Sequence, residues 1–428
     1  MIKFSLSNLF HNLQKLFIGK LAKSSGWLFA GAIFGGILGY LFQITMGRML
    51  GVDQYGVFVA IIALMSILSS PLGTLTMMIS RKVSAFTVEQ KSDQLIHMFQ
   101  FVTIRSLLIV ALILLPIALY IESIREFLRI NNSFHLYLLF ALIFISFPQS
   151  INNAYLQGLQ YFKWISSNGV IGVSLKFLLA VWFVSLGFGV SGAMLAVLIS
   201  SLLVLIISYI VLRKFLKRQR NTLKVSEYFS FKKALPVLIA NISFAVMTQM
   251  DMVIVEYFFN ANESGIYAAA SVLGKVVMYL PGGIVIALFP MVAENHSQGK
   301  SSSHFLLQAV SITLIICGGA AIFYYLFSSQ VVYMLYGESY QEASEILKYF
   351  GFAILPMSLI LVAEHFLIAM GKVLFAYLIL ALTPLQIITI YFFHDSLIDI
   401  VIIVGIFGAI MTAIGYLVLY KALSMKSQ

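Results

Sequence analysis

Charged residues are scarce in this sequence, and their scarcity decides the class of protein. Only 10% of the 428 residues are Asp, Glu, Lys or Arg, whereas 61% are hydrophobic and the mean hydropathy is +0.98. A soluble globular domain carries about 25% charged residues, so this composition excludes an ordinary soluble protein. The chain is therefore predicted to be a membrane protein.

Cysteine and the sequence motifs of common enzymes are also lacking. The single cysteine, Cys317, lies in an apolar run, so no intramolecular disulfide can form. The sequence shows no nucleotide-binding loop, metal-ligand cluster or nucleophile triad. The longest predicted outer connections, near 121–133 and 328–343, are each about 15 residues, which is short for a domain that holds an acceptor. We expect no enzyme activity, no cofactor and no bound metal.

Long apolar runs dominate what is present. Each lasts about 20 residues, the length that crosses the hydrocarbon of a bilayer as a helix, and none shows the alternation of barrel strands. The sequence therefore predicts an all-α polytopic membrane protein with twelve transmembrane helices. The predicted spans lie near residues 27–46, 57–79, 98–120, 134–156, 164–186, 190–212, 234–257, 265–289, 305–327, 344–368, 373–393 and 397–419.

The longest polar interval between two spans, residues 213–233, carries eight basic residues and one acid, Glu227. Counting Lys and Arg on alternate sides of the twelve spans gives 20 on the side of this connector and 3 on the other. Basic residues accumulate on the cytoplasmic side, so we expect both termini in the cytoplasm. The net charge of +11 therefore reflects membrane topology and does not indicate a nucleic acid partner. The basic residues are Arg213, Lys214, Lys217, Arg218, Arg220, Lys224, Lys232 and Lys233.

Residues 1–25 are predicted to form an amphipathic N-terminal segment. Leucine and phenylalanine recur at intervals of three and four from Leu6 to Leu21, while Lys15 and Lys20 interrupt what would be a cleavable apolar core. We expect a helix that lies on the inner leaflet, with a partner-binding helix as the alternative.

Glycine and proline spacing indicates an internal repeat. Gly56 precedes Pro71 by 15 residues, and Gly265 precedes Pro281 by 16. Each repeat would hold six spans, and because six is even both repeats enter the membrane in the same sense, as a parallel pseudo-twofold. The predicted lobes are 26–212 (N-lobe) and 234–428 (C-lobe), joined by the basic connector 213–233.

Three turns carry motifs that resemble a known family. The run GRMLGVDQYGVF (Gly47–Phe58) looks like the turn after the first span of polysaccharide-exporter flippases. YLQGLQYF (Tyr155–Phe162) fits the turn after their fourth span. ESGIYAAA (Glu263–Ala270), followed by PGGIVIALFP (Pro281–Pro290), is similar to the start of their second lobe. Together with the repeat, these motifs point to the O-antigen flippase-like branch of the multidrug/oligosaccharidyl-lipid/polysaccharide exporter superfamily.

That resemblance implies a transporter of the bacterial cytoplasmic (inner) membrane. Such a flippase moves a polyprenyl-diphosphate-linked oligosaccharide, for example the O-antigen repeat unit of lipopolysaccharide, from the inner to the outer leaflet by alternating access. The expected partners are this glycolipid, membrane lipids and proteins of polysaccharide assembly. An ion-coupled multidrug exporter of the same superfamily is the alternative. An ion gradient, the membrane potential or downstream use of the glycan could supply the energy.

Three basic residues are predicted to lie at membrane depth: Arg105, Lys176 and Lys275. A charge in hydrocarbon is costly, so such residues usually face a wet cavity or a partner. Arginine binds phosphate oxygens with two hydrogen bonds and lysine acts as a point charge, so a cationic cavity would suit a diphosphate. Arg48 and Arg81 near span ends are further candidates, with snorkelling to the interface as the alternative.

Acidic residues in the spans leave a second interpretation open. Asp251, Glu256 and Glu364 could pair with the cations, or Asp251 could couple transport to protons or sodium. His365 could pass a proton but is expected to be a core histidine. No metal site is predicted.

Glycines at four-residue spacing in the first span form a face that lets another helix approach closely, and they also ease bending. Prolines in two later spans act similarly. The predicted hinge residues are Gly31, Gly35, Gly39, Pro71 and Pro281.

Overall fold

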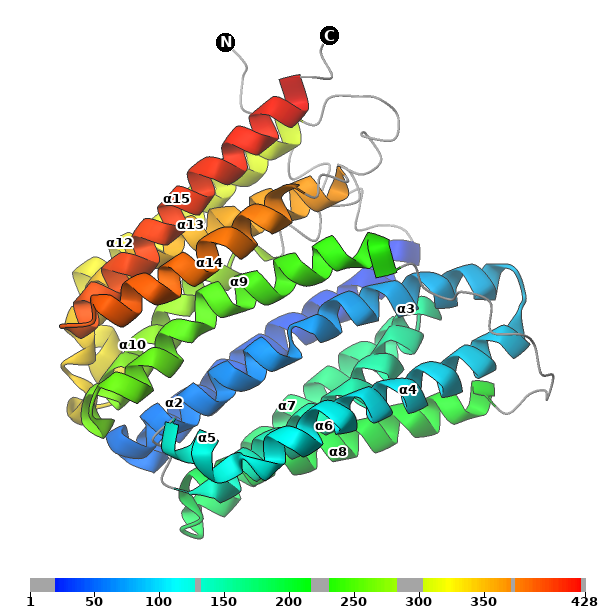
Figure 1. Ribbon diagram of the computed structural model, residues 1–428, viewed down its shortest axis with the longest axis horizontal. Helices are drawn as coiled ribbons and strands as arrows, with labels where there is room; N and C mark the ends of the chain where they lie inside the picture. The colour runs from blue at the N-terminus through cyan, green and yellow to red at the C-terminus, as the bar shows by residue number, and fades with distance from the viewer. Residues whose placement is uncertain (1–19, 128–131, 217–230, 283–302, 371–373, 425–428) are drawn as a thin grey trace. The chain divides into compact units, whose positions relative to one another are not determined.

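The computed structural model describes residues 20–127, 132–216, 231–282, 303–370 and 374–424. In these ranges the regular elements are α-helices and one short 3-10 helix, η1 (Glu338–Tyr340), and no strand occurs (Figure 1). The α-helices are α2 (Lys20–Ser69), α3 (Pro71–Val88), α4 (Ser92–Leu119), α5 (Ile121–Phe127), α6 (Ser133–Gly158), α7 (Phe162–Ser185), α8 (Gly189–Leu216), α9 (Phe231–Phe258), α10 (Ala261–Tyr279), α12 (Ser303–Leu335), α13 (Ala343–Ala369), α14 (Leu374–Phe392) and α15 (Leu397–Ser424).

As far as the residues are described, the predicted spans fall on helices; the first two are joined in α2, and the second continues into α3. Among the described residues, ten helical segments are long and apolar enough to cross a membrane, and the first of them, Ala30–Val88, is 59 residues long. Because about 20 residues span the hydrocarbon, this segment contains two crossings. The backbone turns between them at Gly51, whose φ of 75° and ψ of 171° favour glycine.

Some sequence predictions concern residues outside the described ranges. They are the N-terminal segment up to residue 19, the connector from 217 to 230, and the end of the eighth predicted span beyond residue 282. The part of that span that is described forms most of α10.

The chain divides into two compact units. Unit 1 contains Met1–Gln43, Leu75–Leu119 and Phe140–Phe229, and unit 2 contains Ile44–Thr74, Tyr120–Leu139 and Ser230–Gln428. Two N-terminal stretches therefore pack with the C-terminal part of the chain. The lobe boundaries at 26–212 and 234–428 stay a prediction.

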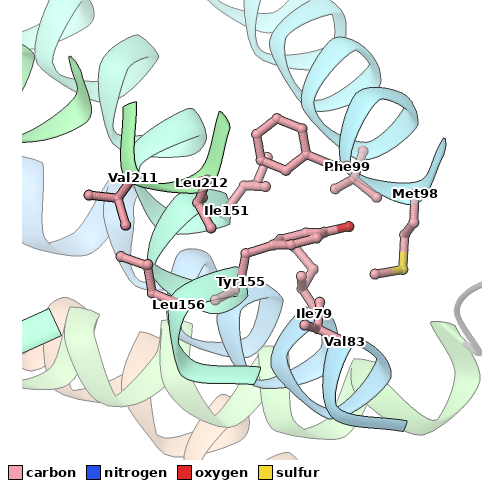
Figure 2. Packing of buried hydrophobic residues seen from close by; sticks show 11 residues of the cluster. Ile79, Val83, Met98, Phe99, Ile151, Tyr155, Leu156, Val211 and Leu212 are labelled. Carbon is pink, nitrogen blue, oxygen red and sulfur yellow. The ribbon is translucent and has the colours of Figure 1, made fainter. Parts of the chain in front are cut away.

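The core of unit 1 forms around Tyr155 of α6 (Figure 2). The Tyr155 hydroxyl donates to the Leu95 carbonyl at 2.9 Å, and its ring meets Phe99 edge-on with centroids 5.0 Å apart. A Cβ at Gly158 would lie 2.5 Å from Val83 Cβ, so only glycine permits this contact between α6 and α3. The YLQGLQYF motif is thus a packing motif. Its cluster consists of Ile79, Val83, Met98, Phe99, Val102, Ile151, Ala154, Tyr155, Leu156, Val211 and Leu212.

The GRMLGVDQYGVF motif organises the core of unit 2 through tyrosine contacts. The Tyr55 and Tyr336 hydroxyls are 3.0 Å apart, and the Tyr340 hydroxyl donates to the Gly47 carbonyl at 2.6 Å. A Cβ at Gly47 would lie 2.5 Å from the Tyr336 ring. Burial raises the pKa of Tyr340, which lies between α12 and α13. These contacts tie the motif to the end of α12 and to η1.

A second pair of glycines brings α2 against α10 in unit 2. A Cβ at Gly56 would lie 2.8 Å from the Gly265 nitrogen, and one at Gly265 would lie 1.9 Å from the Val52 carbonyl oxygen. Asn260 and Glu263 form a reciprocal capping box at the start of α10. The two motifs singled out in the sequence, near Gly56 and near Gly265, therefore pack on each other.

Candidate functional site

Lys275 belongs to a buried ion pair in unit 2. Its Nζ lies 3.1 Å from Asp251 Oδ1 and 3.4 Å from Gln249 Oε1. The Tyr267 hydroxyl donates to Asp251 Oδ2 at 2.9 Å. Lys275 is 7% exposed and Asp251 is 1% exposed, so water screens the pair little. This ammonium is already neutralised by a carboxylate.

Arg105 of α4 has an aromatic partner instead. Its Cζ lies 4.0 Å from the ring centroid of Phe101, one helical turn earlier. The side chain is exposed, and no acid among the described residues pairs with it. The guanidinium can therefore receive an anion while it keeps the ring contact.

Lys176 of α7 is placed in the same way. Its Nζ lies 4.4 Å from the ring centroid of Phe42 of α2, a residue that is 2% exposed. Lys176 is half-buried, and within the described ranges it makes no ion pair. A ring face stabilises a cation by about 0.5–2 kcal/mol without neutralising its charge. Lys176 thus remains a charged group that can receive an anion.

The composition of unit 1 explains why no described carboxylate pairs with these two cations. Unit 1 contains 16 Lys and Arg against 3 Asp and Glu, whereas unit 2 contains 11 against 13. The net charges are therefore +13 and −2, which add to the +11 of the whole chain. The three acids of unit 1 are Glu89, Asp93 and Glu227, and none lies in the predicted spans that contain Arg105 and Lys176.

The remaining acidic candidates lie in unit 2. The Ser264 hydroxyl donates to Glu256 Oε2. Glu364 of α13 is 3% exposed, and its Oε1 has no hydrogen-bond partner among the described residues. The neighbouring His365 contacts the Leu361 carbonyl through Nδ1 at 2.8 Å. Glu364 therefore does not pair with any of the described cations.

The two basic residues near span ends have different surroundings. Arg48 donates from Nε to the Leu335 carbonyl at 2.7 Å and also to the Met334 carbonyl. Both carbonyls belong to the last turn of α12, where helix carbonyls lack intrahelical partners, so Arg48 caps that helix. Arg81 of α3 is exposed and makes no ion pair with a described residue.

The predicted hinge residues also differ. A Cβ at Gly31 would lie 2.1 Å from Ser166 Oγ, so Gly31 serves a close contact between α2 and α7. A Cβ at Gly35 or Gly39 would meet nothing within 4 Å, so these positions are free of that constraint. Pro71 begins α3, and Pro281 is buried after the end of α10.

The bend at Gly51 lies in the predicted turn Gly47–Phe58, although sequence reasoning did not single out that residue, and it missed the aromatic partners of the two cations. Phe101 could have been found, because it precedes Arg105 by four residues on the same helix face. Phe42 could not, because it contacts Lys176 from another helix that lies 134 residues earlier in the chain. Gly51 follows Leu50 in the first motif, and nothing in the sequence there indicates its backbone angles.

Comparisons with solved structures identify the fold. An inward-facing multidrug resistance MATE family transporter of the MOP superfamily aligns with a TM-score of 0.73 at 17% identity, covering 92% of this chain and 95% of that one. A MOP superfamily transporter from Pyrococcus furiosus gives 0.67 at 19%, covering 97% and 98%. A Vibrio cholerae MATE transporter gives 0.64 at 15%, covering 95% and 99%. These alignments confirm the predicted fold class, an all-α polytopic membrane protein with twelve transmembrane helices in two lobes.

The sequence comparisons give the family. No curated protein matches the chain significantly. The profile of the family described as polysaccharide biosynthesis protein matches residues 45–345, which is more than half of the chain and includes all three motifs that suggested a polysaccharide exporter. This multi-pass membrane protein therefore belongs to the polysaccharide biosynthesis protein family and has the fold of the MOP superfamily transporters.

Proposed function

We propose that this protein is a flippase that moves a polyprenyl-diphosphate-linked oligosaccharide from the inner to the outer leaflet by alternating access. The family match supports a role in polysaccharide biosynthesis, and the fold supports membrane transport. The glycan would be an O-antigen or another surface polysaccharide repeat unit. The protein would act as a transporter without enzymatic activity.

The observation that carries this proposal is the state of the two cations of unit 1. Arg105 and Lys176 each lie over a phenylalanine ring, and neither pairs with a carboxylate of a described residue. Two uncompensated positive charges in membrane-spanning helices are costly unless an anion meets them during the transport cycle. A diphosphate supplies that anion, and it is the charged part of the proposed substrate.

The chemistry of such a substrate explains why a protein is needed. Its diphosphate and sugar hydroxyls would lose their hydration in hydrocarbon, a cost that prevents unaided crossing. Arg105 can hold phosphate oxygens with two parallel hydrogen bonds, and Lys176 adds a point charge. The polyprenyl tail needs no polar contact, so it can stay in lipid while the head moves.

The other candidates take different parts in this proposal. Lys275 is held by Asp251 and so is not available to phosphate unless that pair opens. Arg48 caps α12, and Arg81 remains a candidate contact near a span end. Asp251, Glu256 and Glu364 are the candidate groups for coupling to an ion gradient.

A multidrug exporter is the second candidate, because MATE transporters share the fold and because unit 2 buries acidic groups that would suit cationic drugs. The Pyrococcus furiosus transporter is described as having a binding pocket of reverse polarity that suggests a different function. By the same reasoning, the uncompensated cations of unit 1 favour an anionic substrate for this chain.

Lipid analysis after gene deletion tests the proposal. We expect a polyprenyl-diphosphate oligosaccharide to accumulate on the inner side of the membrane, measured by mass spectrometry of extracted lipids, and the wild-type gene to reverse it. A gene carrying Arg105→Met and Lys176→Met should fail to do so at equal protein level. Absence of the lipid together with sensitivity to cationic drugs would reject the flippase and support the exporter.

The proposed location is the bacterial cytoplasmic membrane with both termini in the cytoplasm. The excess of Lys and Arg in the 213–233 connector supports this topology. Reporter fusions at the two ends should both report the cytoplasmic side. The proposed partners are the glycolipid, membrane lipids and polysaccharide assembly proteins.

A further inference from the structure

The segment 47–56, between the first two predicted spans, is bound to the end of α12 and to η1 by hydrogen bonds. Arg48 donates from Nε to the Leu335 carbonyl at 2.7 Å and from a second nitrogen to the preceding carbonyl. The Tyr340 hydroxyl donates to the Gly47 carbonyl at 2.6 Å. Hydrogen bonds from a charged donor are about twice as strong as neutral ones, so Arg48 makes the strongest polar contacts of this segment.

The same segment packs closely against the start of α10. A Cβ at Gly56 would lie 2.6 Å from Ser264 Oγ, and a Cβ at Gly265 would lie 1.9 Å from the Val52 carbonyl oxygen. Ser264 is 0% exposed, so water does not reach this contact. Gly56 and Gly265 are the corresponding glycines of the predicted repeat. The two repeats therefore meet at equivalent positions, as a parallel pseudo-twofold allows.

All these contacts lie on one side of the proposed topology. Each of the three segments that meet here follows an odd-numbered span, so with the N-terminus in the cytoplasm each faces outward. We refer to the contact of residues 47–56 with residues 264–265 and 334–340 as the outer seam. A transporter that works by alternating access closes one side while the other is open. A contact that joins the two repeats on the outer side must therefore part before a substrate leaves.

We propose that the outer seam is the exit gate of this protein and that Arg48 is its latch. The inference rests on the proposed function, because it assumes alternating access. It gives Arg48 a role other than binding phosphate, since two of its guanidinium nitrogens already donate to helix carbonyls. Arg48 is exposed, so water replaces these hydrogen bonds when the seam parts, and the net cost of opening is modest.

A reversible cross-link across the seam tests the gate. Cys317→Ala first removes the single native cysteine. Arg48→Cys with Met334→Cys then places thiols at two exposed residues that are hydrogen-bonded in the native protein. A bis-methanethiosulfonate reagent whose spacer replaces the arginine side chain should stop translocation of an undecaprenyl-diphosphate-linked oligosaccharide in proteoliposomes. A reductant should restore it. Binding of the lipid should stay unchanged, because the linked state is the one that receives substrate.

Ser329→Cys with Gln341→Cys is the matched control. These two side chains are hydrogen-bonded to each other, and they lie on the same side of the proposed topology as the seam. Both belong to the C-terminal repeat, one on α12 and the other directly after η1. The same reagent should therefore link them without lowering the translocation rate.

Labelling of Ser264→Cys measures the latch. This buried position lies behind Gly56, so a membrane-impermeant maleimide added outside should reach it only when the seam parts. In the Cys317→Ala protein, Arg48→Met should raise the labelling rate about tenfold, because it removes two hydrogen bonds of a charged donor. Arg125→Met, which loses the bond to Glu122 outside the seam, should leave the labelling rate unchanged.

The outcomes separate the gate from the proposed function. Full translocation by the protein linked between positions 48 and 334 overturns the gate, and an unchanged labelling rate in Arg48→Met overturns the latch. If thermal unfolding shows that the first cysteine pair does not fold, Arg48→Cys with Leu335→Cys is measured by the same criterion. A protein that does not translocate the lipid even without a cross-link rejects the proposed function. Labelling at position 264 needs no lipid and still decides whether the seam opens.

Discussion

Unit 1 and unit 2 differ in whether the cations of their membrane-spanning helices pair with an acid. Unit 2 pairs its intramembrane lysine, Lys275, with Asp251, and the charges cancel inside the protein. No described acid pairs with Arg105 or Lys176 of unit 1, and both lie over phenylalanine rings that leave the positive charge in place. An internal ion pair stabilises its own unit, whereas in the proposed function the unpaired cations bind the anionic head of the substrate. The comparison teaches that membrane depth alone does not identify a binding residue.

The largest effect on stability is expected from breaking the pair in unit 2. Asp251→Asn should leave the Lys275 ammonium buried without a counter-charge and lower the free energy of unfolding by about 3–5 kcal/mol. Thermal unfolding in detergent measures this loss. The double variant Asp251→Asn, Lys275→Met should recover most of it, because it removes both charges.

Lys176→Met is the corresponding change in unit 1 and sharpens the comparison. It removes a cation–π contact and no ion pair, so its cost should stay within about 0.5–2 kcal/mol. An equal loss of stability in Asp251→Asn and Lys176→Met would contradict the difference between a lysine paired with a carboxylate and one that is not.

Ligand stabilisation should depend on unit 1. Undecaprenyl diphosphate at ten times its dissociation constant should raise the free energy of unfolding of the wild-type protein by about 1.4 kcal/mol. The variant Arg105→Met, Lys176→Met should lose this increment, and Asp251→Asn, Lys275→Met should keep it. If the unit 2 variant loses the increment and the unit 1 variant keeps it, the anion site lies in unit 2.

The smallest effects are expected from the two tyrosine hydroxyls that hold the cores. Tyr155→Phe removes the bond to the Leu95 carbonyl in unit 1, and Tyr336→Phe removes the bond to Tyr55 in unit 2. Each should lower the free energy of unfolding by about 1 kcal/mol, measured by thermal unfolding, without changing lipid affinity. A change in affinity in either variant would mean that these cores are coupled to the site.

Much of the fold could be predicted because each span is a long apolar run in the sequence. The turn between the first two spans was predicted within Gly47–Phe58, but its position at Gly51 was not, because the sequence does not specify the φ angle of a single glycine. The glycines of the motifs were noticed as a resemblance, and the structure gives their physical reason in the close contacts of Gly56 and Gly265.

The candidate site could be predicted only in part. Composition pointed to Arg105, Lys176 and Lys275 alike, because all three are basic and lie in spans. What separates them is whether a carboxylate from another helix reaches them, and pairing between helices is a property of tertiary packing that sequence spacing does not encode. The same limit hid the contact of Phe42 with Lys176.

Translocation of an undecaprenyl-diphosphate-linked oligosaccharide from one leaflet to the other in proteoliposomes tests the central claim most directly. Two charge-neutralised proteins are compared at equal reconstitution: Arg105→Met, Lys176→Met in unit 1 and Asp251→Asn, Lys275→Met in unit 2. We predict that the first lowers the translocation rate by about 100-fold, equivalent to about 2.7 kcal/mol, while the second retains most of it. Full activity of the unit 1 variant would contradict the claim that its uncompensated cations carry the substrate.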